Sequence, residues 1–322
     1  MAAVAAVRLG LRRGKLCGRL GALAFSSGQE RLGAGARSFP WARASLPPLR
    51  AGEGGKARER FAFTRVLART RTPFVKVPFC RNVVLSNPRR RNALSLAMLK
   101  SLRKDLLRDS PDLRVIIISG EGPVFSSGHD LKELSREAGE KYHLEVFETC
   151  AELMTLLSKL PVPIIAKVNG LATAAGCQLV ASCDIAVASE ESTFATPGVN
   201  VGLFCSTPAV PVGRSLPRKV ALEMLFTGEP ITAREALLHG LVSRVVPAEK
   251  LEDETLRIAR KICESSRSVL ALGKAAFYKQ MAQDVETAYR TTAKVMVDNL
   301  ALEDGREGIE AFLCKRKPTW SP

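Results

Sequence analysis

The chain has 322 residues, a formal net charge of +16, 46% hydrophobic residues and 25% charged residues. These proportions are ordinary for a globular protein and allow a full hydrophobic core. No run reaches the roughly 18 consecutive apolar residues of a transmembrane helix, which excludes a predicted membrane span. The eight cysteines form no CxxC pair and no cluster with histidine at zinc spacing, so we predict no metal site.

The positive charge is concentrated at the N-terminus. Residues 1–60 hold ten arginines and two lysines against three glutamates, and no acidic residue precedes Glu30. Arg8, Arg12, Arg13 and Arg19 recur among leucine and alanine at roughly helical spacing. This pattern is typical of a mitochondrial transit peptide; the alternative is a disordered basic tail that binds acidic surfaces. We predict a transit peptide and disordered linker at 1–60, and a mature protein in the mitochondrial matrix.

Strands and helices are expected to alternate along the next part of the chain. Dense β-branched runs at 83–85, 114–119, 164–168 and 184–188 predict strands, the densest of them buried on both faces. Ser95 is expected to cap a helix that carries Met98, Leu99, Leu102 and Leu106 on one face, and Thr232 begins a capping box with Glu235. Gly240 is expected just after that second helix. We further predict a strand at 241–246 and helices at about 139–160, 249–264, 267–281, 284–300 and 307–314. The sequence therefore predicts an α/β fold followed by a helical region.

Two loops of small residues follow predicted strands. The first is FSSGHDLK at 125–132 and the second is NGLATAAGCQ at 169–178. Small side chains let a ligand carbonyl approach the backbone, and free N–H groups at a helix start favour negative charge. Two such donors from separate loops would form an oxyanion hole for a thioester enolate.

The chain resembles the crotonase, or enoyl-CoA hydratase/isomerase, family from about residue 75 to 318. The matching segments are LSNPRRRNALS (85–95), VIIISGEGPVFSSGHDLKEL (115–134), PVPIIAKVNGLATAAGCQL (161–179), CDIAVASEESTFATPGVNVGL (183–203), FTGEPITAREALLHGLVSRVV (226–246) and DGREGIEAFLCKRK (304–317). The resemblance implies a crotonase (ClpP/crotonase-like) fold of repeated ββα units, with the core at 61–258 and a C-terminal helical trimerisation region at 259–322. It also implies a homotrimer or a dimer of trimers.

The same resemblance implies a ligand and the residues that hold it. The ligand is an acyl-CoA thioester, with coenzyme A as part of the substrate and no separate cofactor. His129 and Ala175 are expected to provide the backbone N–H groups of the oxyanion hole. Arginine and lysine suit the phosphates of coenzyme A. The residues expected to contact coenzyme A are Arg89, Arg90, Arg91, Ser127, Asp130, Leu131 and Lys132, together with Phe312 and Lys315 from a neighbouring subunit.

The sequence departs from the family at the two glutamates that hold the water and exchange its protons in hydratases. The first aligns with Gln178 and the second with Gly198, and neither residue can act as a general acid or base. Asn200 and Ser206, expected to line the pocket nearby, do not titrate usefully. His129 is then the remaining titratable group beside the pocket.

We therefore predict an acyl-CoA-binding protein of mitochondrial fatty-acid and lipid metabolism in which ordinary enoyl-CoA hydration is doubtful. One alternative is an active decarboxylase, isomerase or thioesterase that relies on enolate stabilisation. A second alternative is RNA binding, because the chain stays basic beyond its leader. Aromatic residues total 6% and offer no predicted stacking surface, so nucleic acid is the least favoured partner.

Overall fold

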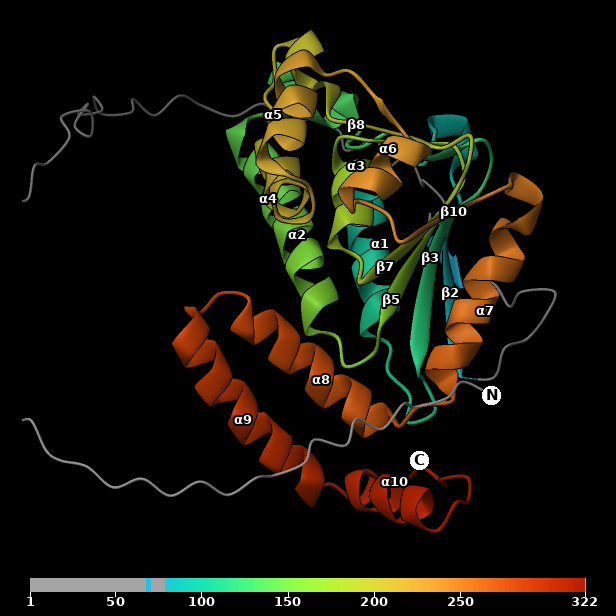
Figure 1. Cartoon of the computed structure of the whole chain (residues 1–322). Helices are drawn as coiled ribbons and strands as arrows, with labels where there is room; N and C mark the ends of the chain where they lie inside the picture. The colour runs from blue at the N-terminus through green and yellow to red at the C-terminus, as the bar shows by residue number, and fades with distance from the viewer. Residues whose placement is uncertain (1–67, 71–78, 322) are drawn as a thin grey trace, which may run out of the picture. The chain divides into compact units, whose positions relative to one another are not determined.

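The computed structural model of the chain describes residues 68–70 and 79–321, so the predicted transit peptide at 1–60 lies outside the described residues. Figure 1 shows strands that alternate with helices, which confirms the α/β class. One sheet has the strand order β1-β2-β3-β5-β7-β10, parallel except for β1. Its register places Ile117 opposite both Asn82 and Ile165. These strands are β1 (Ala68–Thr70), β2 (Cys80–Leu85), β3 (Val115–Gly120), β5 (Ile164–Val168), β7 (Ile185–Ser189) and β10 (Arg244–Val246).

A second, smaller sheet has the order β4-β6-β8-β9. Each of β3, β5 and β7 continues into one short strand of this sheet and then into helix, which confirms the predicted ββα repeats. The short strands are β4 (Val124–Ser126), β6 (Leu171–Thr173), β8 (Thr193–Ala195) and β9 (Ile231–Thr232). The helices are α1 (Leu96–Leu107), α2 (Glu140–Lys159), α3 (Ala175–Ser182), α4 (Ser206–Ser215), α5 (Arg218–Thr227), α6 (Ala233–His239), α7 (Leu251–Cys263), α8 (Arg267–Gln280), α9 (Val285–Ala301) and α10 (Glu303–Leu313).

The larger sheet is buried on both faces. On β3, Ile116 and Ile118 belong to the main apolar cluster, whereas Val115 and Ile117 belong to a second cluster on the opposite face. This alternation follows from the two-residue period of a strand. Helix α7 covers the second face with Leu256 and Ala259, and Figure 1 shows it on the side opposite α1 and α2. Burial on both faces of the sheet thus explains why the sequence of β3 has consecutive apolar residues instead of alternating ones.

Local sequence signals mark the start of α1 and both ends of α6. Ser95 accepts a hydrogen bond from Met98 N–H, and Thr232 and Glu235 form the predicted capping box. Gly240 has φ of 89° and ends α6. The strand predicted at 241–246 was wrong at its start, because the N–H groups of Leu241 and Val242 bond to Ala236 O at the end of α6. The last helix begins at Glu303, earlier than predicted.

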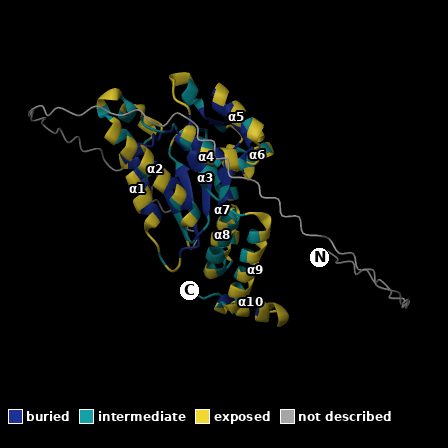
Figure 2. Cartoon of the chain, turned by 90° about the vertical axis from the view of Figure 1, so that its left-hand side faces the viewer, coloured by how far each residue is buried: buried dark blue, intermediate teal, exposed yellow. Residues whose placement is uncertain are grey.

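The C-terminal arm, which we define as residues 266–321, contains α8, α9 and α10. In Figure 2 these helices are mainly exposed or half-exposed, unlike the dark blue sheet. The domain boundary predicted at 258 falls inside α7, and its position stays a prediction. Within 68–70 and 79–321, none of the helices combines the length and the apolar character needed to cross a membrane.

Candidate acyl-thioester site

The first small-residue loop overlaps β4 at its start, and its part after the strand, residues 127–130, is fixed to the turn that precedes α1. Ser127 N–H donates to Arg91 O at 3.0 Å, and Gly128 O accepts from Leu94 N–H at 2.7 Å. Gly128 has φ of 82°, in the left-handed region that favours glycine. Among the described residues, no acceptor pairs with the N–H of His129.

The second loop ends in the N-terminus of α3. Ala174 has φ of 48° and its N–H donates to Ala195 O. The first bond of the helical ladder runs from Gln178 N–H to Ala174 O at 2.9 Å. Ala175 N–H, at the first position of the helix, therefore has no acceptor within α3, as is usual for a helix start.

The structure brings the two loops into contact. A Cβ placed on Gly128 would stand 3.2 Å from Ala175 N and 2.9 Å from Thr173 O. Position 128 therefore has space for glycine and for no larger residue. The backbone of the first loop lies against the start of α3, as an oxyanion hole requires. The donor roles of His129 N–H and Ala175 N–H stay a prediction.

The His129 side chain contacts Leu94, just before α1, and Phe147 of α2. Its Nδ1 donates to Leu94 O at 3.2 Å, since a carbonyl oxygen can only accept. The ring packs edge-on against Phe147 of α2, with centroids 5.2 Å apart. Burial lowers the pKa of His129, partly offset by the bond to Leu94 O. The imidazole is therefore neutral at pH 7, and its Nε2 is buried without a partner.

A polar cavity of about 350 Å³ opens beside the first loop. It gathers seven of the nine residues expected to contact coenzyme A. Arg90 forms an ion pair with Asp130 at 3.0 Å, and Asp130 Oδ1 also accepts from Lys132 N–H. The cavity is lined by Arg89, Arg90, Arg91, Ala93, Ser127, His129, Asp130, Leu131 and Lys132.

The other two expected residues lie elsewhere in the single chain. Phe312 is on α10, lines a separate hollow with Trp320 and is 82% exposed. Lys315 follows the end of α10 with φ of 55°. Neither residue contributes to the arginine-lined cavity of its own chain, so their coenzyme A contacts stay a prediction that needs a second copy.

Asn92, which sequence reasoning missed, organises the arginine turn. Its side chain is fully buried, with Nδ2 donating to Glu121 O and Val124 O and Oδ1 accepting from Asn87 N–H. Arg91 and Asn92 both have positive φ. Asparagine tolerates this conformation better than most residues, and its place after three arginines in a turn was the available signal.

Gln178 and Gly198, the two residues predicted to align with the family glutamates, differ in their surroundings. Gln178 on α3 is 3% exposed and its Oε1 has no partner. A Cβ on Gly198 would stand 2.3 Å from Leu203 O and 2.8 Å from Cys205 Sγ. Neighbouring atoms therefore fill the space in which a side chain at 198 would begin.

Asn200 and Ser206, expected to line the pocket, are exposed and lie apart from the arginine-lined cavity. The Nδ2 atom of Asn200 lies beside Gly228. Ser206 begins α4 and its hydroxyl donates to Phe204 O at 3.4 Å. Their predicted contact with an acyl group stays a prediction.

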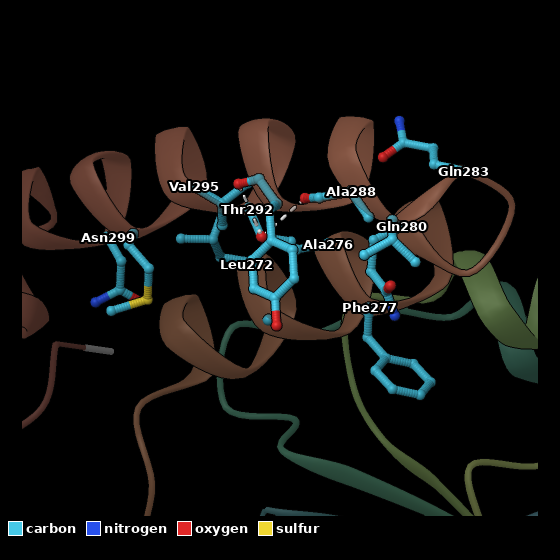
Figure 3. A pocket seen from close by; sticks show the side chains of 13 residues that line it. Leu272, Ala276, Phe277, Gln280, Gln283, Ala288, Thr292, Val295 and Asn299 are labelled. Carbon is cyan, nitrogen blue, oxygen red and sulfur yellow. Dashed lines mark hydrogen bonds between the residues drawn. The ribbon is translucent and has the colours of Figure 1, made fainter. Parts of the chain in front are cut away.

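A larger hollow, of about 540 Å³, lies between α8 and α9. Figure 3 shows side chains of both helices around it, among them Leu272, Phe277 and Val295. Its lining contains no charged residue, so it offers no group to pair with a phosphate. The arginine-lined cavity, though smaller, is the better candidate for a coenzyme site.

Comparison with known proteins identifies the family. The sequence profile described as enoyl-CoA hydratase/isomerase matches residues 81–322. The chain belongs to the enoyl-CoA hydratase/isomerase family. Mitochondrial enoyl-CoA hydratase domain-containing protein 3 of Mus musculus is 74% identical over 243 residues, covering 75% of this chain and 81% of the relative. Its Homo sapiens counterpart is 71% identical, covering 75% of this chain and 80% of that protein.

Solved structures agree with this assignment. The crystal structure of human enoyl-CoA hydratase domain-containing protein 3 matches with a TM-score of 0.76 at 67% identity, covering 79% of this chain and 99% of that chain. An enoyl-CoA hydratase from Mycobacterium smegmatis matches with a TM-score of 0.75 at 42% identity, covering 79% and 98%. The crotonase fold expected from the sequence is thus confirmed. The relatives' names also confirm the predicted mitochondrial localisation.

Proposed function

We propose that this enoyl-CoA hydratase/isomerase family member binds an acyl-CoA thioester in the mitochondrial matrix and does not hydrate enoyl-CoA. The observation that carries the proposal is the cavity in which Arg89, Arg90, Arg91 and Lys132 lie next to the loop that contacts the start of α3. Cationic side chains suit the phosphates of coenzyme A. A helix N-terminus suits the negative charge that develops on a thioester oxygen.

The absence of hydration follows from the chemistry of the two aligned positions. Water addition needs groups that exchange protons near pH 7, which a neutral amide and a glycine cannot do. Each such group typically accelerates a reaction by about 10²–10⁴-fold. His129 does not replace them, because its Nδ1 proton is donated to Leu94 O and its ring packs against Phe147.

A second candidate function is decarboxylation, isomerisation or thioester hydrolysis through enolate or oxyanion stabilisation. The observation that favours it is Ala175 N–H, which has no acceptor among the described residues and stands beside Gly128. Loss of CO₂ from a malonyl-type thioester needs stabilisation of the enolate more than it needs a base. Such a reaction fits a site that is rich in donors and poor in acids.

Titration calorimetry with butyryl-CoA tests binding. We expect saturable binding by the purified protein and a roughly tenfold weaker affinity in Arg90→Gln, which removes a charged donor from the cavity. Arg103→Gln is the matched control, because Arg103 is an exposed residue of α1 that pairs with Glu152. Absence of butyryl-CoA binding, or equal effects of the two variants, would refute the proposed site.

A substrate screen then tests turnover. We expect no hydration of crotonyl-CoA. Malonyl-CoA, 3-enoyl-CoA and saturated acyl-CoA test decarboxylation, isomerisation and thioester hydrolysis in turn. Turnover of any one of these establishes the second candidate function, and crotonyl-CoA hydration at family rates contradicts the first.

A further inference from the structure

The C-terminal arm is attached to the core with little apolar burial. The two apolar clusters of the described chain contain no residue beyond Cys263. Helices α8 and α9 have no fully buried residue. Since apolar burial usually dominates the docking of a helix, polar contacts must carry much of the attachment here.

Two sets of polar contacts join α8 to the core. Arg267, at its start, donates to Leu113 O and pairs with Asp109. The second set converges on Asp184, which lies between α3 and β7. Its Oδ2 accepts from Lys274 Nζ at 2.6 Å and from Ile164 N–H at 2.7 Å, and its Oδ1 accepts from Tyr278 O–H at 2.8 Å. Lys274 and Tyr278 are both on α8. The side chains of Lys274 and Asp184 are 7% and 16% exposed, so this is a buried ion pair.

Lys274 also donates hydrogen bonds to carbonyl oxygens at and just after the end of α2. Its Nζ donates to Leu157 O at 2.8 Å and to Val162 O at 3.0 Å, in addition to Asp184. All three ammonium protons are therefore used. Leu157 O lies in the last turn of α2, where carbonyls lack helical partners and a cation is favourable. One lysine of the arm thus bonds to three separate segments of the core.

The arm is also connected within itself, so that its parts move together. Asp304 at the start of α10 accepts from the hydroxyls of Ser266 and Ser268 at the start of α8. Helix α9 packs along α8 (Figure 3). A displacement of α8 would therefore carry α10 with it, including Phe312.

We propose that Asp184, Lys274 and Tyr278 form a polar latch that positions the C-terminal arm, and through it the arm residues Phe312 and Lys315, at the coenzyme end of the ligand held by a second copy of the chain. The latch lies between α3 and α8 and does not touch the arginine-lined cavity. Its loss undocks the arm while the apolar core stays folded. The positioning part of this inference rests on the proposed acyl-CoA function, whereas the docking part does not.

Hydrogen exchange of the purified protein tests docking. Lys274→Met keeps the apolar stem and removes the ammonium group, which leaves a buried carboxylate without its charge partner. We expect amides of α8 and α10 to exchange on the order of 100-fold faster, with β2 and β3 unchanged. The matched control is Lys294→Met on α9, where Lys294 pairs with Asp298 and is 77% exposed. Unchanged exchange in the arm, or faster exchange in β2 and β3 as well, overturns the latch.

Ligand comparison tests positioning. Butyryl-CoA carries the nucleotide that the arm is proposed to contact, whereas S-butyryl-pantetheine lacks it. We expect Lys274→Met to weaken butyryl-CoA binding roughly tenfold and to leave S-butyryl-pantetheine binding unchanged, and Lys294→Met to change neither. Equal losses for both ligands overturn the positioning role. If the unmodified protein binds no butyryl-CoA, the proposed function fails, and the exchange experiment still decides whether the latch docks the arm.

Discussion

Gly198 is the residue that we predict to stand at the position of the second family glutamate, and its neighbours are backbone atoms and a buried thiol. A Cβ there would stand 2.3 Å from Leu203 O and 2.8 Å from Cys205 Sγ. The carbonyl cannot simply move aside, because Leu203 N–H is itself bonded to Gly198 O at 2.9 Å. Replacing this glycine therefore forces the 198–205 segment to change its backbone.

Gly198→Ala should lower the free energy of unfolding by about 1–3 kcal/mol, the usual cost of overpacking. Gly213→Ala is the control, since Gly213 lies inside α4 and a Cβ there would meet nothing within 4 Å. That change should raise the unfolding free energy by about 0.5–1 kcal/mol. Urea denaturation monitored by circular dichroism measures both. If Gly198→Ala is as stable as the parent, the closed geometry at 198 is wrong.

The same geometry predicts that two glutamates will not rebuild a hydratase. Gln178→Glu together with Gly198→Glu restores both carboxylates in sequence, but the second has no space in which to reach a ligand. We expect no hydration of crotonyl-CoA in the double variant or in Gln178→Glu alone. Hydration is measured as the decrease in enoyl-thioester absorbance. One general acid–base group typically supplies a rate increase of about 10²-fold or more. A stably folded double variant that hydrates crotonyl-CoA at least about 10²-fold faster than Gln178→Glu would therefore refute the reasoning.

Three further changes test other parts of the site. Gly128→Ala should weaken butyryl-CoA binding in calorimetry and cost about 1–3 kcal/mol of unfolding free energy, because φ is 82° and the new Cβ would stand 2.9 Å from Thr173 O. Asn92→Ala should lower the melting temperature and reduce the unfolding free energy by about 2–4 kcal/mol, since it removes the three hydrogen bonds of a fully buried side chain. A loss below about 0.5 kcal/mol would contradict this. Burial lowers the pKa of His129 in the folded state, so its contribution to stability is present above the unfolded pKa and is lost as pH falls. The free energy of unfolding, measured by urea denaturation, should therefore decrease less between pH 7.5 and pH 5.0 in His129→Gln than in the parent. Equal decreases would contradict this prediction.

The elements that could be predicted from the sequence are those whose cause is local. The run at 114–119 became β3 because consecutive β-branched residues suit a strand covered on both faces. Thr232 and Glu235 lie three residues apart and cap one helix without distant partners. The arginine turn and the FSSGHDLK loop were each visible, and their meeting in one cavity follows from the order of parallel strands.

The features that could not be predicted depend on residues distant in sequence or on segments too short to show a period. Strands β4, β6 and β8 have three residues each, too few for an alternation pattern. The role of Asn92 needs carbonyls about 30 residues further on. The lack of space for a side chain at Gly198 depends on how the chain turns back at Leu203. Residue propensities do not predict that path.

The polar groups near the start of α3 limit the chemistry that the site can support. Asp130 is paired with Arg90, and His129 is neutral with its Nδ1 proton donated to Leu94 O. Gln178, which we predict to stand where the family has a glutamate, is a neutral amide. What remains beside the loop is a set of N–H donors and cations, which stabilise negative charge but do not shuttle protons. A reaction that builds charge on the thioester oxygen without needing an acid is therefore the one this arrangement can accelerate. We accordingly expect that, if the substrate screen finds any turnover, malonyl-CoA will react and crotonyl-CoA will not.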